Sequence, residues 1–172
     1  MEWKEELQQH TKEAEKVVQG YLPEETGHQK LLIEASNYSV LVGGKRLRPM
    51  IMLESFKAFG GTGNVVEPFM AALEMIHSGS LVHDDLPCMD NDEYRRGNLT
   101  TWKKYGYDMA VLAGDKLFIY AFEIAAKAFA LTDRADLVGK AISILANKAG
   151  IYGMIGGQSV DVEYTDRPVT KS

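Results

Sequence analysis

A short stretch in the middle of this sequence places acidic and basic side chains next to one another. Asp84, Asp85 and Asp90 are followed within a few residues by Arg95 and Arg96. Carboxylates and guanidiniums this close neutralise each other unless a ligand lies between them. A polyphosphate bridged by a divalent metal ion is such a ligand, because carboxylates bind the metal while arginines bind the remaining phosphate oxygens. The stretch therefore predicts chemistry on a diphosphate.

A second cationic cluster lies in the turn Gly-Gly-Lys-Arg-Leu-Arg-Pro. Lys45, Arg46 and Arg48 precede a helix that Pro49 is expected to open. The free N–H groups and the dipole of a helix N-terminus add to this positive field, which favours an anion. A solvated basic turn is the alternative interpretation. Two separate cationic clusters suit two anionic substrates.

The end of one helix must bring the acids together. On an ideal helix Asp84 and Asp85 are about 100° apart, whereas Asp90 lies about 120° from Asp84. Pro87 removes a backbone donor, and we expect the resulting deformation to bring Asp90 to the other two. His77, seven residues before Asp84, lies on nearly the same face. A solvated acidic helix end is the alternative, but acids oppose the dipole at a helix C-terminus, and a bound cation would offset this.

Helices are predicted for nearly the whole chain, so the expected fold class is all-α, with helices long enough for a bundle. The glycine-rich loop at residues 60–64 follows a helix and lacks a Lys-Ser/Thr pair, so we interpret it as a turn. Gln158 and Asp161 share a helix face, where a polar helix end is the default interpretation. The expected helices cover residues 3–21, 29–42, 49–59, 65–86, 107–130 and 133–152.

Composition limits the possible classes of function. The 172 residues, 45% hydrophobic and 25% charged, are enough for one globular domain. A net charge of −5 argues against a nucleic-acid-binding protein. The single cysteine, Cys88, and a charged N-terminus without a secretory signal favour a cytoplasmic location. No apolar run approaches the roughly 20 residues of a membrane span.

Four motifs together resemble those of the trans-isoprenyl diphosphate synthases, the family that includes the farnesyl and geranylgeranyl diphosphate synthases. Their order and spacing make the resemblance specific, and it extends over most of the chain. The motifs are Gly43-Gly-Lys-Arg-Leu-Arg-Pro49, His77 with His83-Asp-Asp-Leu-Pro-Cys-Met-Asp90, Arg95-Arg-Gly97 and Gly157-Gln-Ser-Val-Asp161.

The resemblance implies a bundle of antiparallel helices around a deep cavity, usually in a dimer, so a homodimer is expected. It implies a prenyltransferase that condenses isopentenyl diphosphate with an allylic diphosphate, dimethylallyl or geranyl, with Mg²⁺ as cofactor. Asp84, Asp85 and Asp90 resemble the aspartates that bind Mg²⁺, and Arg95 resembles an arginine that binds the allylic diphosphate. The residues similar to the isopentenyl diphosphate site are Lys45, Arg48, His77 and Arg96, and Gln158 is similar to a polar residue beside the allylic site.

Product length depends in this family on the position five residues before Asp84. Many farnesyl synthases carry an aromatic ring there, which closes the floor of the product cavity, but this chain has Gly79. Met75, Ile76 or a residue of a neighbouring helix would have to close the floor instead. Farnesyl diphosphate is the expected product, and a geranylgeranyl diphosphate synthase is the alternative.

The family continues well past the position that matches Ser172 and there supplies a second aspartate-rich motif. We therefore expect residues 1–172 to be the N-terminal part of a truncated polyprenyl synthase domain that by itself is inactive or nearly so. A non-catalytic, half-length partner subunit of such a synthase is the alternative. The intact acidic and arginine clusters argue against it, because a scaffold does not need them.

Overall fold

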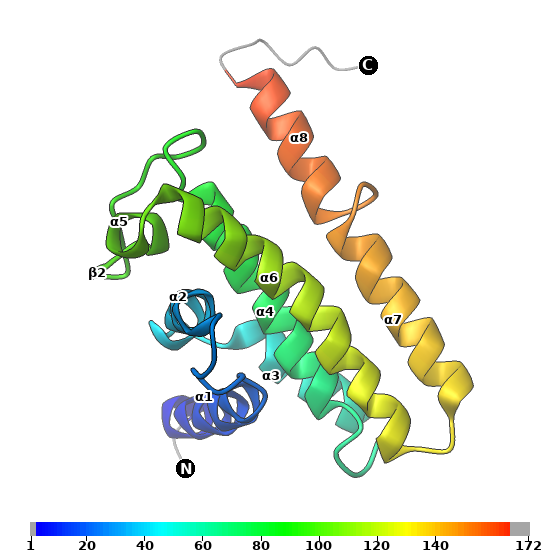
Figure 1. Ribbon diagram of the computed structural model, residues 1–172. Coiled ribbons are helices and arrows are strands. Elements are labelled where there is room, and N and C mark those ends of the chain that lie inside the picture. Colours follow the sequence, from blue (N-terminus) through cyan, green and yellow to red (C-terminus); the bar gives the residue numbers. More distant parts are fainter. Residues whose placement is uncertain (1–2, 166–172) are drawn as a thin grey trace. The chain divides into compact units, whose positions relative to one another are not determined.

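Figure 1 shows a computed structural model of the chain, which describes residues 3–165. Tertiary contacts divide the chain into two compact units, Met1–Asp133 and Arg134–Ser172. The predicted single domain over residues 1–172 also includes residues 1–2 and 166–172, which lie outside the described residues. The first unit carries most of the predicted site, and the second carries Gln158.

Both units are built from helices. Over residues 3–165 the predicted all-α class is confirmed, because the strands there have two residues each. No helix in that range is both long and apolar enough to cross a membrane. The first unit contains α1 (Trp3–Gly20), α2 (Lys30–Leu41), α3 (Leu47–Ala58), α4 (Glu67–Asp84), β1 (Tyr94–Arg95), β2 (Asn98–Leu99), α5 (Thr101–Tyr105), α6 (Tyr107–Ala126) and the 3₁₀-helix η1 (Lys127–Leu131); the second contains α7 (Ala135–Ala149) and α8 (Met154–Tyr164).

The central helix of the first unit is α4. It packs most extensively against α6, which runs antiparallel beside it in Figure 1, and it also contacts α1, α2 and α3. Near its start, Met70 joins Ala14 of α1, Met50 of α3 and Val66 in a buried apolar cluster. Burial of apolar surface is the main favourable contribution to folding, so packing against several helices fixes the direction of α4.

Two glycines allow α4 and α6 to approach closely. A Cβ atom at Gly79 would lie 3.2 Å from the Cβ of Leu117 and 3.3 Å from the carbonyl oxygen of Gly114. A Cβ atom at Gly114 would overlap the imidazole of His83. That imidazole lies across α6, with its Nε2 atom 3.1 Å from the Val111 carbonyl oxygen. Small residues at both positions therefore set the distance between the two helices.

Several elements differ from the prediction, among them α5, which no predicted helix covers, and α6, which ends at Ala126 instead of residue 130. The helix expected to reach residue 86 ends at Asp84, since a residue before a proline disfavours the helical conformation and Pro87 follows. The helix expected over 133–152 ends at Ala149, and a separate helix begins at Met154 after a glycine-containing turn. The β1–β2 hairpin is absent from the predicted elements, because two-residue strands produce no alternating pattern.

Replacing Gly114 by alanine tests the close contact between α4 and α6. We expect Gly114→Ala to lower the free energy of unfolding by about 1–3 kcal/mol, because the imidazole of His83 must leave its position. Gly20→Ala is the matched control, since nothing lies within 4 Å of its added Cβ atom, and its effect should stay below about 1 kcal/mol. Urea unfolding followed by circular dichroism measures both. Equal stability of the two variants would show that His83 is not held against α6.

Candidate functional site

The residues after α4 fold back and return Asp90 to the end of the helix. The Asp90 N–H donates to the carbonyl oxygen of Asp84 at 2.8 Å, and the Met89 N–H donates to the carbonyl oxygen of Leu86 at the same distance. Asn91 then adopts a positive φ of 55°, which asparagine tolerates better than most residues. A tight turn after the helix end, rather than a deformed helix, thus brings Asp90 to Asp84.

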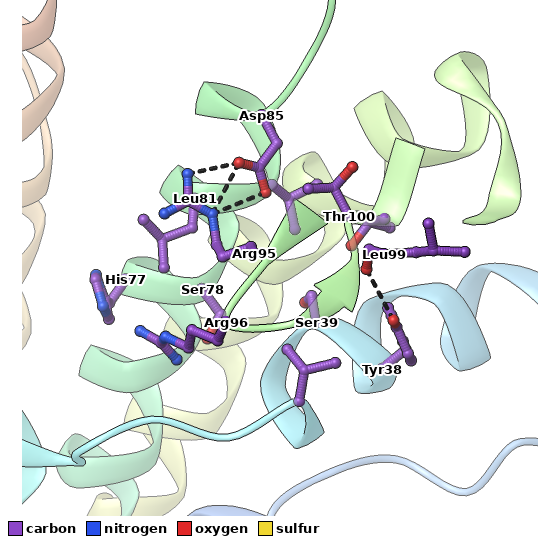
Figure 2. Close-up of a pocket in the computed structure, with 13 residues that line it drawn as sticks. Tyr38, Ser39, His77, Ser78, Leu81, Asp85, Arg95, Arg96, Leu99 and Thr100 are labelled. Atoms are coloured by element: carbon purple, nitrogen blue, oxygen red, sulfur yellow. Dashed lines mark hydrogen bonds and ion pairs between the residues drawn. The ribbon is translucent and has the colours of Figure 1, made fainter. Parts of the chain in front are cut away.

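Asp85 forms an ion pair with Arg95 (Figure 2). The Nε of Arg95 donates to both carboxylate oxygens, at 2.8 and 3.0 Å, and Nη2 donates to Oδ1. Asp85 is only 3% exposed. Burial raises the pKa of Asp85, and the Arg95 guanidinium opposes that rise. The hydrogen bonds to Asp85 raise the pKa of Arg95, so the guanidinium stays charged and is held in one position.

Asp84 is in a different environment from Asp85. Burial and then the charge of Asp90 raise the pKa of Asp84, while Arg95 opposes the rise. Within residues 3–165, no three His, Cys, Asp or Glu side chains are placed to hold a metal ion by themselves. Mg²⁺ is usually held by one or two carboxylates together with substrate phosphates, and Asp84 with Asp90 fits that pattern. The three-aspartate metal site stays a prediction.

The β1–β2 hairpin directs its two arginines to different places. Arg96 and Gly97 form its turn with φ of 54° and 83°, and two positive φ values match the twist of a tight hairpin. Figure 2 shows Arg95 turned toward Asp85 and Arg96 turned away from it. Nη1 of Arg96 donates to the carbonyl oxygen of Gly43. The hairpin is therefore tied to the end of α4 by one arginine and to the turn before α3 by the other.

A cavity of about 340 Å³ lies where the turn before α3 meets α4 and the hairpin. Its lining includes all four residues that the resemblance implies for the isopentenyl diphosphate site. Gly44 also borders it, and a Cβ atom there would lie 3.2 Å from the guanidinium carbon of Arg96, so a larger residue would displace this arginine. The lining residues are Gly44, Lys45, Arg46, Leu47, Arg48, Glu74, His77 and Arg96.

The surroundings of His77 in this cavity favour the neutral form of its imidazole. Burial lowers the pKa of His77, the charge of Arg48 lowers it further, and Arg96 and Arg46 add smaller effects, whereas Glu74 opposes them. The Nε2 of His77 lies 3.4 Å from Nη1 of Arg48. A neutral imidazole accepts a hydrogen bond from that guanidinium. A bound anion would favour the protonated imidazole and turn His77 into a donor.

A smaller cavity lies beneath the hairpin, between α2 and α4 (Figure 2). It measures about 20 Å³ and shares His77 and Arg96 with the larger cavity. This volume has room for roughly one water molecule and not for a diphosphate. The hydroxyl of Tyr38, on α2, donates to the carbonyl oxygen of Leu99 at 2.8 Å and so fixes the second strand of the hairpin. We interpret this cavity as part of the support of the hairpin.

Two predicted positions lie outside this arrangement. Gln158 lies in α8, which belongs to the second unit, so its role beside an allylic diphosphate stays a prediction. Gly79 faces α6, where Leu117 and Phe118 lie within contact distance of an added Cβ atom. A neighbouring helix therefore occupies the space beside this glycine, and the closing of the product-cavity floor by a residue of that helix stays a prediction.

The prediction missed two residues that support the site. Tyr38 holds the hairpin and packs edge to face on Tyr105, with ring centroids 5.5 Å apart. Nothing in the sequence separates it from other aromatic residues on apolar helices. Glu74 lines the cationic cavity although it is an acid. It did carry a signal, because a carboxylate inside the apolar run Met70–Ile76 requires a buried partner.

Comparisons with known proteins agree with this geometry. Residues 29–171 match the sequence profile of the family described as "Polyprenyl synthetase". The chain is 49% identical over 129 residues to the chloroplastic geranylgeranyl pyrophosphate synthase of Catharanthus roseus. It is 39% identical over 166 residues to the farnesyl diphosphate synthase of Geobacillus stearothermophilus. These alignments cover 75% and 96% of this chain, but it spans only 36% and 56% of the two relatives.

A solved structure is similar as well. The apo crystal structure of an FPP/GFPP synthase from Zymomonas mobilis superposes with a TM-score of 0.89 at 34% sequence identity. The superposition covers 98% of this chain and 60% of that one. The predicted helical fold of the isoprenoid synthase type is thereby confirmed for the part of the fold that this chain spans.

Asp84→Asn tests the repulsion at the end of α4. We expect it to raise the free energy of unfolding at pH 7 by less than about 1 kcal/mol, because Asp84 is partly solvated. The pKa of Asp84 is raised in the folded state, so ionisation of this group lowers stability as the pH rises above the unfolded value of about 3.9. The gain should therefore disappear below about pH 4. Urea unfolding at several pH values measures the difference from wild type.

Asp92→Asn is the control for that experiment. The Asp92 carboxylate lies 3.7 Å from the Arg95 guanidinium, so its removal loses an attraction that offsets its repulsion of Asp85, and it should not stabilise the protein. A loss of stability in Asp84→Asn at pH 7 would contradict the proposed repulsion between Asp84 and Asp90.

Proposed function

We propose, from the premise that this chain belongs to the polyprenyl synthetase family, that the protein is a short-chain prenyltransferase. It condenses isopentenyl diphosphate with an allylic diphosphate, dimethylallyl or geranyl diphosphate. The observation that carries the proposal is the opposite orientation of Arg95 and Arg96. These adjacent residues serve two separate anion sites, which a reaction between two diphosphates requires.

The allylic diphosphate is assigned to the end of α4. Asp84 and Asp90 would hold Mg²⁺ there, which supplies positive charge to the diphosphate as a leaving group. Arg95 keeps its Nη1 group outside the hydrogen bonds to Asp85 and offers it to a diphosphate oxygen. Asp85 orients Arg95, and metal binding by Asp85 would compete with that ion pair.

Isopentenyl diphosphate is assigned to the cationic cavity. Lys45 and Arg48 flank the turn before α3, and Arg96 and His77 face the same cavity from the hairpin and α4. Lys45, Arg48 and Arg96 donate hydrogen bonds, and His77 becomes a further donor when it is protonated. These four side chains suit a diphosphate bound without metal. This diphosphate is not the leaving group, so it needs to be held firmly and not activated.

The reaction follows from these two placements. The allylic C–O bond breaks and its electron pair leaves with the diphosphate, whose developing charge Arg95 stabilises. The double bond of isopentenyl diphosphate, anchored by Lys45 and Arg48, donates an electron pair to the allylic carbon and forms the new carbon–carbon bond. A proton is then lost to an oxygen of the released diphosphate, which restores a double bond. Exclusion of water protects the cationic carbon until that step.

Farnesyl diphosphate is the proposed product, and geranylgeranyl diphosphate is the second candidate. Relatives of both kinds resemble the chain, so these comparisons do not decide between the two products. Gly79 carries no ring that would stop growth, and Leu117 and Phe118 lie beside it instead. A homodimer, a cytoplasmic location, the role of Gln158 and the low activity of residues 1–172 by themselves stay predictions, as does the alternative of a non-catalytic partner subunit.

A condensation assay tests the proposal. The complete natural protein is incubated with Mg²⁺, labelled isopentenyl diphosphate and dimethylallyl diphosphate, and the dephosphorylated products are separated by chain length. We expect a C15 product, and a C20 product would favour the second candidate. We expect Arg95→Gln to lower kcat by at least about 100-fold, the typical effect of losing a donor to a charged leaving group. Absence of any prenyl product would overturn the proposed activity.

Ligand binding can be tested on the 172-residue chain itself. We expect Mg²⁺ and inorganic pyrophosphate together to raise the melting temperature by more than the sum of their separate effects, because the metal and the anion complete one site. Asp90→Asn should remove this synergy. Glu93→Gln is the matched control, since Glu93 is an exposed acid of the same loop that pairs with Lys103 at 2.6 Å. Additive shifts in the wild type would show that the acids and Arg95 do not act together.

A further inference from the structure

Arg46 differs from the two cations beside it. Lys45 and Arg48 are exposed, whereas the side chain of Arg46 is only 1% exposed. Arg46 borders the cationic cavity, but its guanidinium is covered, and its Nη1 and Nη2 groups are already bonded to Glu74, Val40 and Glu15. The turn before α3 therefore contains two cations available to an anion and one cation with a different task.

The buried guanidinium of Arg46 joins three helices. Nη1 donates to Oε1 of Glu74 on α4 at 2.7 Å. Nη2 donates to the carbonyl oxygen of Val40 on α2 at 2.6 Å and to Oε1 of Glu15 on α1 at 3.3 Å. The backbone of Arg46 also caps α3, since its carbonyl oxygen accepts from the Met50 N–H. Its side chain is thus fixed from three directions.

The charge of Glu74 explains why its ion pair with Arg46 matters for anion binding in the cationic cavity. Glu74 is 3% exposed, and it is the one acid among the described residues that line the cationic cavity. A carboxylate in a partly buried cavity repels a diphosphate strongly, because low polarity weakens screening. Pairing with Arg46, which is closer to Glu74 than to Glu15, reduces this repulsion without using Lys45 or Arg48.

The backbone of Arg46 also determines where its neighbours point. Its φ is 48°, in the left-handed region that side-chain-bearing residues rarely adopt. Such a conformation persists only where surrounding contacts hold it. The bonds to Glu74 and Val40 supply that hold, and the turn then presents Lys45 before the helix and Arg48 in its first turn.

We propose that Arg46 is the positioning residue of the cationic cavity: it neutralises Glu74 and fixes the left-handed turn, so that Lys45 and Arg48 are free to bind a diphosphate. The inference rests on the proposed function, which assigns a metal-free diphosphate to this cavity. Arg46 does not touch the ligand and acts through Glu74 and the turn.

The test measures binding of inorganic pyrophosphate by calorimetry in the presence of a chelator, so that no metal contributes. We expect Arg46→Met to weaken binding by at least about tenfold, because it leaves Glu74 charged and unpaired in the cavity. Glu74→Gln should bind as tightly as wild type or more tightly, although the protein is less stable. The double variant Arg46→Met/Glu74→Gln should recover most of the affinity.

Two further variants control for general effects. Glu54→Gln removes one acid from an exposed pair with Lys57 at 2.8 Å on α3, and it should leave the affinity within about twofold because exposed charges are well screened. Arg46→Lys keeps the charge and should retain more affinity than Arg46→Met. If Arg46→Met does not fold, Glu74→Gln and Arg46→Lys decide the matter by the same expectations.

The outcomes separate this inference from the proposed function. The inference is overturned if Glu74→Gln weakens binding as much as Arg46→Met, or if the double variant recovers no affinity. Either result would mean that the Arg46–Glu74 pair only stabilises the fold. The proposed assignment of the cavity stands in that case, provided that Lys45→Ala weakens binding. No binding of pyrophosphate by the wild type would overturn both.

Discussion

The burial of α4 on nearly all sides is the constraint on which the first unit depends. Its close contact with α6, through Gly79 and Gly114, leaves little of its surface for polar groups. Acids on such a helix must find partners or lie at its end, since an unpaired buried charge is strongly unfavourable. Glu74, in the middle of the helix, pairs with Arg46, and Asp85, just after its end, pairs with Arg95, whereas the neighbouring Asp84 has no ion pair of comparable strength.

The ion pairs distinguish residues that support the site from residues that are available to a ligand. Arg46 and Arg95 each form an ion pair with a buried carboxylate, and that ion pair holds each guanidinium in one position. Lys45 and Arg48 remain exposed, and Asp84 repels Asp90 instead of pairing with a cation. Groups that are left unneutralised in this way are the ones that gain most from a ligand of opposite charge. The sequence shows an acidic and basic stretch and a cationic turn, and it does not distinguish the supporting residues in them from those available to a ligand.

Motifs and helices could be predicted from the sequence because both depend on local patterns. The turn after Leu41, the loop at residues 60–64 and the two cationic clusters follow from residue types and spacing. The hairpin could not be predicted, since Arg96 adopts a positive φ that its residue type disfavours and only tertiary contacts stabilise it. The ion pair between Arg46 and Glu74 joins residues 28 positions apart, so local spacing gives no sign of it.

The hairpin fixes the distance between the two proposed anion sites. Three hydrogen bonds to backbone carbonyl oxygens hold its base. The Thr100 N–H donates to the carbonyl oxygen of Glu93. The Thr100 hydroxyl and the Trp102 indole N–H both donate to the carbonyl oxygen of Asp92. Arg95 and Arg96 are adjacent on this framework, so backbone geometry rather than side-chain flexibility sets their separation. Two substrates that must react with each other benefit from such a fixed spacing, because loss of alignment by about 1 Å slows a reaction severely. A flexible loop with the same two arginines would bind both diphosphates and still fail to align them.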